Sequence, residues 1–228
     1  MNGMDISRRA FLRTSMFAVA GAAVGLAGCG ASRSASSSSA TSSSSSSSSS
    51  AEAAGQSSQQ VEAAGGSNKP LVLYFSYTGN VDKMAHWIAD ETGGDLVRVT
   101  AKDTYPDDYD ATVNRAKEEL DKNARPEINV DLSEEQLSGY STVYFGFPIW
   151  WYDLPTPMCT FLESYSLSGK EVIPFFSHAG SASGANSLTT LESLATGATV
   201  RSNDAISILG DDVNGSEQTV REWVKGLA

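Results

Sequence analysis

The sequence predicts an α/β fold in which helices cover both faces of a five-stranded parallel sheet. Three observations lead to this prediction. Residues 70–228 alternate short apolar runs with amphipathic segments, an alternation typical of parallel sheets. The first run, 71–75, is apolar at every position, as expected for a strand covered on both faces. The 159 residues of this part are also enough to enclose one core.

The first half of this part contains two expected strand–helix pairs. They are strand 71–75 with helix 81–91, and strand 96–99 with helix 107–122. In the first helix Val81, Met84 and Ile88 recur at helical spacing, and Gly93 follows its end. The second helix has acidic residues in its first turn and a lysine in its last, which suits the helix dipole.

The second half continues the same alternation. Its expected elements are strand 142–147, helix 155–165, strand 171–176, a helix around 188–194, strand 205–209 and helix 216–227. Pro155 suits the first turn of its helix. Pro174 lies inside the fourth strand, and because proline has no N–H to donate, it argues against a central position for that strand.

Residues 1–28 predict an export signal. The pair Arg8-Arg9 precedes a weakly apolar run, 14–27, which is shorter than the roughly 20 residues of a membrane-spanning helix. The pair, with Phe-Leu soon after it, resembles a twin-arginine signal. Residues 26–29 resemble a bacterial lipobox, which implies cleavage before Cys29 and a diacylglycerol on its sulfur. The alternative is an uncleaved signal anchor in which Cys29 has no role.

Residues 29–69 predict a disordered tether, because 18 of these 41 positions are serine and large apolar side chains are almost absent. Such a chain has a root-mean-square span of roughly 35 Å. We therefore expect the domain at 70–228 to be held near the extracytoplasmic face of the bacterial membrane by a lipid anchor alone. A twin-arginine signal exports proteins that are already folded, so it also favours a non-covalent cofactor loaded inside the cell.

The charge of residues 70–228 bears on the partner. This part has 11 Lys and Arg against 24 Asp and Glu, a formal net charge of −13. A binder of nucleic acid needs a basic face, so this class is excluded, whereas a basic protein partner fits. With only Cys29 and Cys159 in the chain, we expect no disulfide framework and no metal site.

Ligands of doubly wound sheets bind where the carboxyl ends of the strands meet, so three loops define the candidate site. The first is 76–81, and its members are Ser76, Tyr77, Thr78, Gly79, Asn80 and Val81. It offers hydroxyls, an amide and a helix N-terminus, which together suit a phosphate. The alternative is a turn in which Thr78 or Asn80 only caps the helix.

The second loop carries consecutive aromatic residues after the third strand, in the run Pro148, Ile149, Trp150, Trp151 and Tyr152. Such a cluster is typical of a binding surface for a flat ring. The alternative, that a tryptophan fills the core, is expected for at least one of the pair.

The third loop contains Ser177, His178, Ala179 and Gly180. Its small residues allow a ligand to approach the backbone. His178 either acts near neutral pH or caps the next helix. Outside the loops, His86 is expected at the surface, and Cys159 is expected to be a small buried apolar residue.

Several segments resemble the flavodoxin family. Residues 71–81 resemble its opening, whose first loop has the pattern Ser/Thr-x-Thr-Gly-Asn-Thr. The segments 105–109, 147–151, 167–170 and 177–181 resemble a flavodoxin-like subfamily common in bacteria. The resemblance covers essentially all of 70–228 and implies strand order 2-1-3-4-5 and the cofactor flavin mononucleotide (FMN).

The resemblance also implies roles for the three loops. Ser76, Thr78, Gly79, Asn80 and the backbone of Val81 would hold the phosphate of FMN. Pro148, Ile149, Trp150 and Trp151 would line the flavin ring, with residues 177–180 on its other side. Position 81 departs from the family, which has Thr or Ser there. Losing that hydroxyl removes a donor worth about 1 kcal/mol.

These observations predict an FMN-binding electron-transfer protein that needs no catalytic acid, base or nucleophile. The sequence has no Gly-rich fingerprint for a nicotinamide nucleotide, so we expect electrons to arrive from a redox protein partner. Two alternatives stay open. One is an FMN-dependent reductase of quinones on the same fold. The other is a flavin-free binding module, for which Val81 is the only support.

Overall fold

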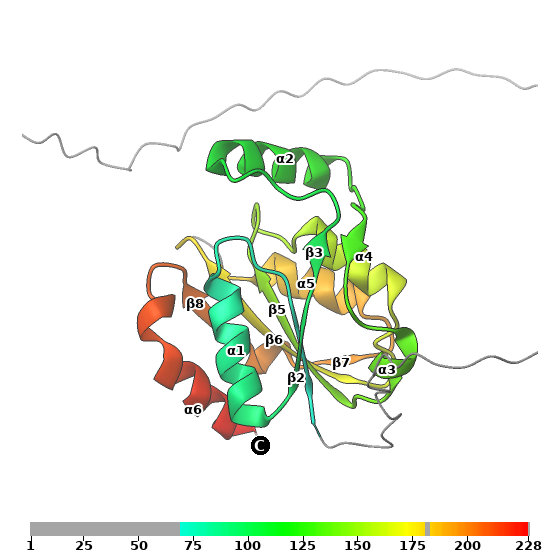
Figure 1. Ribbon diagram of the computed structural model, residues 1–228, viewed down its shortest axis with the longest axis vertical. Helices are drawn as coiled ribbons and strands as arrows, with labels where there is room; N and C mark the ends of the chain where they lie inside the picture. The colour runs from blue at the N-terminus through cyan, green and yellow to red at the C-terminus, as the bar shows by residue number, and fades with distance from the viewer. Residues whose placement is uncertain (1–68, 181–182, 228) are drawn as a thin grey trace, which may run out of the picture. The chain divides into compact units, whose positions relative to one another are not determined.

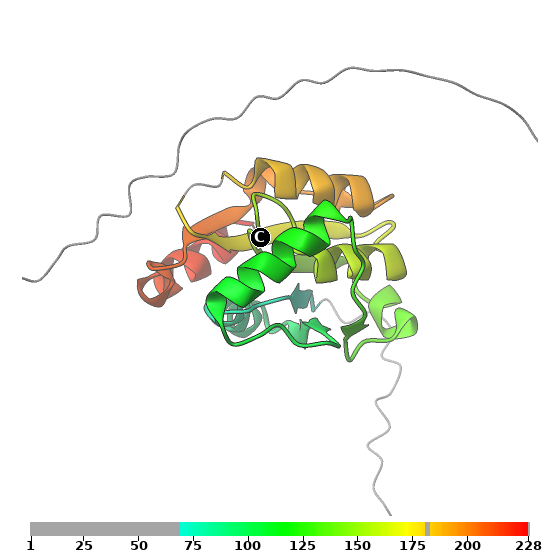
Figure 2. The same ribbon diagram turned by 90° about the horizontal axis from the view of Figure 1, so that it is seen from above.

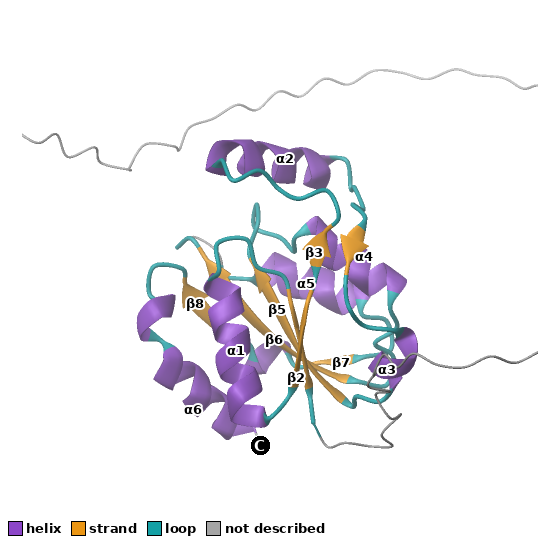
Figure 3. Ribbon diagram, viewed as in Figure 1, coloured by secondary structure: helices purple, strands orange, loops and turns teal. Residues whose placement is uncertain are grey.

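The computed structural model describes residues 69–180 and 183–227 (Figures 1 and 3). Its main sheet is parallel and runs β2-β1-β5-β6-β7, with β8 also paired to β6. The strands are β1 (Leu71–Tyr74), β2 (Asp95–Arg98), β5 (Thr142–Pro148), β6 (Glu171–His178), β7 (Thr199–Val200) and β8 (Ile206–Leu209). This confirms the expected order 2-1-3-4-5, with β7 and β8 sharing the fifth place. The predicted signal, the Cys29 lipid site and the tether lie outside the described residues, apart from Lys69.

Helices cover both faces of the sheet, as predicted (Figures 1 and 2). One layer contains α1 (Asn80–Thr92) and α6 (Glu217–Leu227), and the other contains α4 (Thr156–Ser164) and α5 (Ala185–Leu194). Alternation along β1 explains the two layers, because successive strand side chains point to opposite faces. Val72 and Tyr74 pack in the core under α1 and α6, whereas Leu71, Leu73 and Phe75 pack in the core under α4 and α5.

The expectation that Pro174 disfavours a central strand is wrong, because β6 pairs with β5 on one side and with β7 and β8 on the other. Pro174 lies after the last residue paired with β7 and before the first residue paired with β8. The carbonyls of Val172 and His178 accept hydrogen bonds on the β7 and β8 side of the strand. The backbone polar groups of every second residue, including Pro174, therefore point to that side. The missing N–H therefore falls where the neighbouring edge is interrupted by the short helix η1 (Ser202–Asp204).

Residues 100–129 form an arm that only partly matches the prediction. The strands β3 (Thr100–Ala101) and β4 (Ile128–Asn129) pair antiparallel at its base, and α2 (Tyr109–Asp121) forms its far end. The helix was predicted, but two-residue strands give no detectable periodicity. Figure 1 shows α2 beyond the carboxyl ends of the sheet strands, away from the two helical layers.

Two further short helices, α3 (Glu134–Ser138) and η2 (Val213–Gly215), complete the fold. Within residues 69–180 and 183–227, no helix combines the length and apolar character needed to cross a membrane.

Candidate functional site

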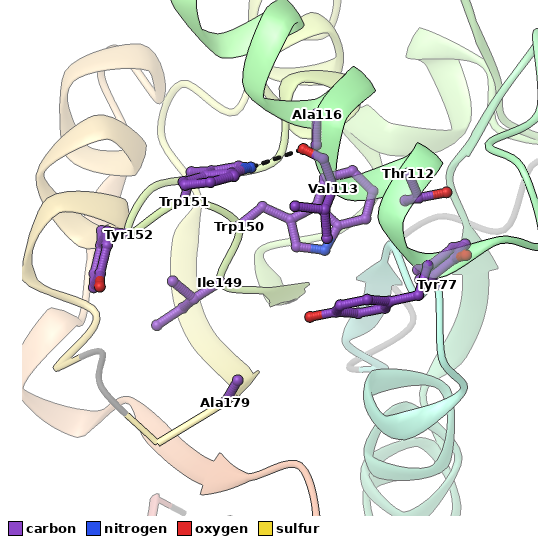
Figure 4. Close-up of a pocket in the computed structure, with 10 residues that line it drawn as sticks. Tyr77, Thr112, Val113, Ala116, Ile149, Trp150, Trp151, Tyr152 and Ala179 are labelled. Carbon is purple, nitrogen blue, oxygen red and sulfur yellow. Dashed lines mark hydrogen bonds between the residues drawn. The ribbon is translucent and has the colours of Figure 1, made fainter. Parts of the chain in front are cut away.

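A cavity of about 260 Å³ opens where the three predicted loops meet (Figure 4). Tyr77 comes from the first loop, Ile149, Trp150 and Trp151 from the second, and Ala179 from the third. The remaining lining residues are Tyr109, Thr112, Val113, Ala116 and Tyr152. The structure therefore brings one or more residues of every predicted loop to a single cavity.

The first loop passes from β1 into α1 without a side-chain cap. Gly79 occupies the N-cap position with φ 87°, and within residues 69–180 and 183–227 no side chain caps the first turn by a hydrogen bond. The alternative in which Thr78 or Asn80 caps the helix is therefore wrong. Gly79 is needed here, because other residues rarely adopt this left-handed conformation. The first amide groups of α1 are consequently left for another acceptor.

The buried hydroxyl of Ser76 has no hydrogen-bond partner within the described chain. The residue is only 5% exposed, and its Oγ is among the buried atoms left unpaired. Leaving such a group unpaired costs about 1–3 kcal/mol. An oxygen-rich anion placed at the start of α1 would accept this bond, so the residues present fit a phosphate.

Two other positions of the first loop face different surroundings. Val81 is 1% exposed and packs in the core under α1 and α6. Asn80 lies against the loop that follows β8, where a side chain on Gly210 would approach its Nδ2 to 2.8 Å. Gly210 thus permits a close contact between the first loop and the end of β8, a neighbour that the sequence reasoning did not identify.

Trp151 and Tyr152 occupy the centre of a tight turn, with φ values of 49° and 66°. Trp150 and Asp153 close the turn through two backbone hydrogen bonds of 3.1 and 2.9 Å. Positive φ at both central positions is usual for Gly or Asn in such turns, so aromatic residues here are strained. Both are exposed, at 41% and 56%. The turn therefore displays two aromatic rings at the cavity.

Trp150 differs from its neighbour, because it is half-buried and packs against the core. Its ring meets those of Phe75, Tyr77 and Tyr105 edge-on, with centroids 5.3, 6.1 and 4.9 Å away. One tryptophan of the pair thus packs inward, as expected, while still lining the cavity. These edge-to-face contacts give the cavity a rigid wall.

Helix α2 supplies a wall that the sequence reasoning missed. Tyr109, Thr112, Val113 and Ala116 recur at i, i+3, i+4 and i+7 and all line the cavity. This weakly apolar face on an otherwise charged helix was visible in the sequence, but nothing there indicated what it faces. The indole Nε1 of Trp151 donates to the Val113 carbonyl at 3.0 Å (Figure 4).

Glu119 anchors the C-terminal part of α2. Its carboxylate accepts hydrogen bonds from Tyr105, Thr156 and Arg115 at 2.5, 2.7 and 2.8 Å. The guanidinium of Arg115 also lies 4.3 Å from the centroid of the Tyr105 ring. Burial, and secondly the bond to Glu119, raises the pKa of Tyr105. The phenol therefore stays protonated and keeps its bond to Glu119 within the arm, while the bond from Thr156 joins the arm to α4.

In the third loop, His178 does not cap the next helix. Its Nδ1 accepts a hydrogen bond from the backbone N–H of Gly180 at 3.0 Å, and the N-cap of α5 is Gly184 without a side-chain bond. The carbonyl of buried Ser177 accepts from the Ile149 N–H at 2.9 Å, which joins the second and third loops. Of the four predicted residues in this loop, Ala179 lines the cavity.

A charged group lies behind the first loop. Asp82, in the first turn of α1, accepts a hydrogen bond from the Tyr74 hydroxyl at 2.7 Å. Arg98 lies 3.5 Å from the same carboxylate oxygen and also donates to the Ser76 carbonyl at 2.8 Å. Burial, and secondly the bond to Asp82, raises the pKa of Tyr74.

Residues outside the loops agree with their expected roles. Cys159 is buried, and burial raises the pKa of its thiol to about 11. His86 is exposed, 3.9 Å from Asp82. In the part of the chain that the structure covers, no group of three or more His, Cys, Asp or Glu is placed to hold a metal ion.

The fold and the site define a class: a flavodoxin-like α/β protein with an aromatic cavity at the carboxyl ends of the strands. The flavodoxin family model matches residues 69–227, and the chain belongs to this family. No curated protein matches the chain.

Solved structures agree with the family. A candidate flavoprotein from Bacteroides uniformis is 32% identical, with a TM-score of 0.59, over 71% of this chain and 99% of its own. A candidate flavoprotein from Bacteroides eggerthii is 30% identical, with a TM-score of 0.57, over 69% and 96%. A flavoprotein from Lactobacillus acidophilus, solved in complex with FMN, is 26% identical, with a TM-score of 0.53, over 65% and 98%.

Proposed function

We propose that this protein is an FMN-binding flavodoxin that transfers electrons to and from a redox protein partner at the extracytoplasmic face of a bacterial membrane. The observation that carries the proposal is the unpaired, buried Ser76 hydroxyl in the loop that leads into α1, where Tyr77 lines the aromatic cavity. The Lactobacillus acidophilus relative in complex with FMN supports the choice of cofactor.

The first loop is the phosphate end of the proposed site. Neutral donors hold the phosphate here: the Ser76 and Thr78 hydroxyls, the Asn80 amide and the backbone amides that begin α1. The positive end of the helix dipole adds to their attraction for an anion. The buried Ser76 hydroxyl gains its missing partner on binding, which favours the loaded state.

The cavity is the ring end of the proposed site. Trp150, locked by three neighbouring rings, and the exposed Trp151 provide apolar area for a planar heterocycle. Ala179 approaches from the third loop without a bulky side chain. FMN supplies the redox chemistry when bound, and the residues of the chain bind it, orient it and shield it from water.

The first experiment measures flavin binding by the purified full chain. We expect a yellow protein with flavin absorption bands after expression with its own signal, and quenching of added FMN fluorescence by the unloaded protein. When the unloaded protein is titrated with FMN, binding should saturate at one flavin per chain. A folded, colourless protein that does not quench FMN fluorescence would contradict the proposal.

The acidic domain favours a basic partner. Asp107, Asp108 and Asp110 are exposed beside Tyr109 at the cavity, and the net charge of residues 70–228 is −13. Oppositely charged partners associate faster at low ionic strength. We therefore expect electron transfer to a basic acceptor protein to slow as salt increases, and an equally good rate with an acidic acceptor would contradict this part of the proposal.

A quinone reductase is the second candidate function. Within the described residues, the exposed large apolar side chains are Tyr109, Trp151 and Tyr152, and all three line the same cavity. An exposed aromatic cavity of this kind favours a small apolar acceptor such as a quinone. Steady-state oxidation of a reduced nicotinamide by the loaded protein, dependent on added quinone, would favour this function. Its absence, with intact electron transfer to a protein, would favour the first.

A further inference from the structure

We infer that Arg98 is a positioning residue for the phosphate end of the site, where it orients the peptide after Ser76 and neutralises Asp82. This inference rests on the proposed binding of FMN. Arg98 belongs to none of the three loops and is not among the residues that line the cavity. Its role follows from two contacts made by one guanidinium group.

The sheet register brings Arg98 to the first loop. It is the last residue of β2 and is paired with Tyr74 near the end of β1. From there its Nη2 donates to the Ser76 carbonyl at 2.8 Å, and its Nη1 lies 3.5 Å from Asp82 Oδ1. The guanidinium thus connects the loop with the first turn of α1.

The bond to Ser76 orients an amide. In a planar trans peptide the carbonyl and the following N–H point in opposite directions. Because the Ser76 carbonyl points to Arg98, the Tyr77 N–H points to the opposite side of the peptide plane. Arg98 therefore holds the Ser76–Tyr77 peptide with its N–H donor turned away from the guanidinium.

The contact with Asp82 concerns charge. A carboxylate in the first turn of a helix interacts well with the helix dipole, but it repels an anion bound at the same end. Asp82 is held by Tyr74 and Arg98, with His86 3.9 Å from its other oxygen. Lys83, the residue after Asp82, donates a hydrogen bond to Asn214 at 2.5 Å. Arg98 thus offsets the charge of Asp82 behind the phosphate position.

The test compares FMN with riboflavin, which carries the same ring without the phosphate. Dissociation constants for both are measured by fluorescence quenching with the full chain and with Arg98→Ala, Arg98→Lys, Asp82→Asn and the double variant Arg98→Ala/Asp82→Asn. Arg221→Ala is the matched control, since Arg221 pairs with Asp90, Glu91 and Glu217 on the α1–α6 face. Its loss changes the net charge equally.

We expect Arg98→Ala to bind FMN about tenfold more weakly, because a partly exposed charged hydrogen bond and an ion pair are lost together. Riboflavin affinity should change by less than about twofold, because the ring-end contacts remain. Adding Asp82→Asn to Arg98→Ala should restore part of the lost FMN affinity. Arg98→Lys should bind FMN with an affinity between those of the parent and Arg98→Ala. Arg221→Ala should leave both affinities unchanged.

Two results would overturn the inference alone: unchanged FMN affinity in a folded Arg98→Ala variant, or an equal loss for FMN and riboflavin, which indicates a general structural role. Thermal melting checks folding, and Arg98→Lys, which keeps the charge, carries the comparison if the alanine variant does not fold. An unmodified chain that binds neither flavin would overturn the proposed function and this inference together.

Discussion

Ser76 and Ser187 are both buried hydroxyls that lack a partner within the described residues, but their surroundings differ. Ser76 lies in the loop between β1 and α1, beside the cavity residue Tyr77. Ser187 is fully buried inside α5 and does not line the cavity. The pair separates the general effect of an unpaired hydroxyl from the specific effect of a ligand donor.

The first prediction compares Ser76→Ala with Ser187→Ala. Both changes should leave the unloaded protein as stable as the parent or more stable by about 1 kcal/mol, because each removes an unpaired buried group. Only Ser76→Ala should weaken FMN binding, by about tenfold. Urea unfolding without flavin and FMN titration provide the two measurements.

Two outcomes for the alanine variants of Ser76 and Ser187 would contradict this prediction. If Ser76→Ala destabilises the unloaded protein and leaves FMN affinity unchanged, the hydroxyl has a structural role and the phosphate position is wrong. Equal FMN affinities for both alanine variants would indicate the same.

Val81 illustrates how a single position serves two environments. Its backbone lies in the first turn of α1, while its side chain is buried in the core with Tyr74 and Met84. A β-branched side chain without a hydroxyl suits that core, because a buried hydroxyl requires a partner. The departure from the family pattern thus has a packing rationale in this chain, and the backbone amide of Val81 is retained as a donor.

At the scale of elements, α2 is held over the cavity by hydrogen bonds from both loops beneath it. The Tyr77 hydroxyl donates to the Pro106 carbonyl at 2.7 Å, and the Trp151 indole donates to the Val113 carbonyl at 3.0 Å. Glu119 ties the C-terminal part of the helix to α4 through Thr156. The position of the missed cavity wall therefore depends on a few polar contacts.

The second prediction removes both loop contacts with the double variant Tyr77→Phe/Trp151→Phe. Loss of two modest hydrogen bonds should lower the opening free energy of α2 by about 1–2 kcal/mol. We expect amide hydrogen exchange in 109–121 to become faster by about tenfold. FMN and riboflavin affinities should fall together, because the affected wall contacts the ring end.

The matched control for α2 is Tyr140→Phe, which removes a hydroxyl bonded to Asp95 at 2.8 Å, near the start of β2. It should leave exchange in α2 and both flavin affinities at their parental values. Unchanged exchange in the double variant would show that the two contacts do not hold the helix.

At the scale of the whole molecule, the two cysteines provide a test of the predicted lipid anchor. Cys159 is 5% exposed, and its pKa of about 11 keeps it a protonated thiol at neutral and mildly alkaline pH. The thiolate is the reactive form. A thiol reagent applied to the native protein at pH 8 should therefore detect Cys29 alone, and only if its sulfur carries no lipid.

The third prediction follows from this difference. Protein from the membrane fraction should show no fast-reacting thiol when native and one after unfolding. The variant Arg8→Lys/Arg9→Lys removes the arginine pair of the predicted twin-arginine signal, and we expect it to accumulate inside the cell with one fast-reacting thiol. Cys29→Ser should abolish membrane retention in the parent, and should abolish the fast reaction in the Arg8→Lys/Arg9→Lys background. A fast-reacting thiol in the membrane-bound protein would contradict lipid attachment at Cys29.

Much of the fold could be predicted because its signals are local. The apolar run 71–75 and the spacing of Val81, Met84 and Ile88 depend on neighbours a few positions away, and β1 and α1 lie there. The three loops could be placed together because parallel strands end at one edge. By contrast, β3, β4 and β7 have two residues each, too few for a periodic pattern.

By itself, the sequence determined the layered α/β architecture, the strand order suggested by family resemblance, and the loops that meet at the cavity. Only the tertiary structure decided that α2 forms a wall of the cavity and that Arg98 donates to the Ser76 carbonyl. It also decided that a central strand accommodates Pro174. These features join residues such as Val113 and Trp151, 38 positions apart. Such contacts arise from packing and sheet register, which no local periodicity encodes.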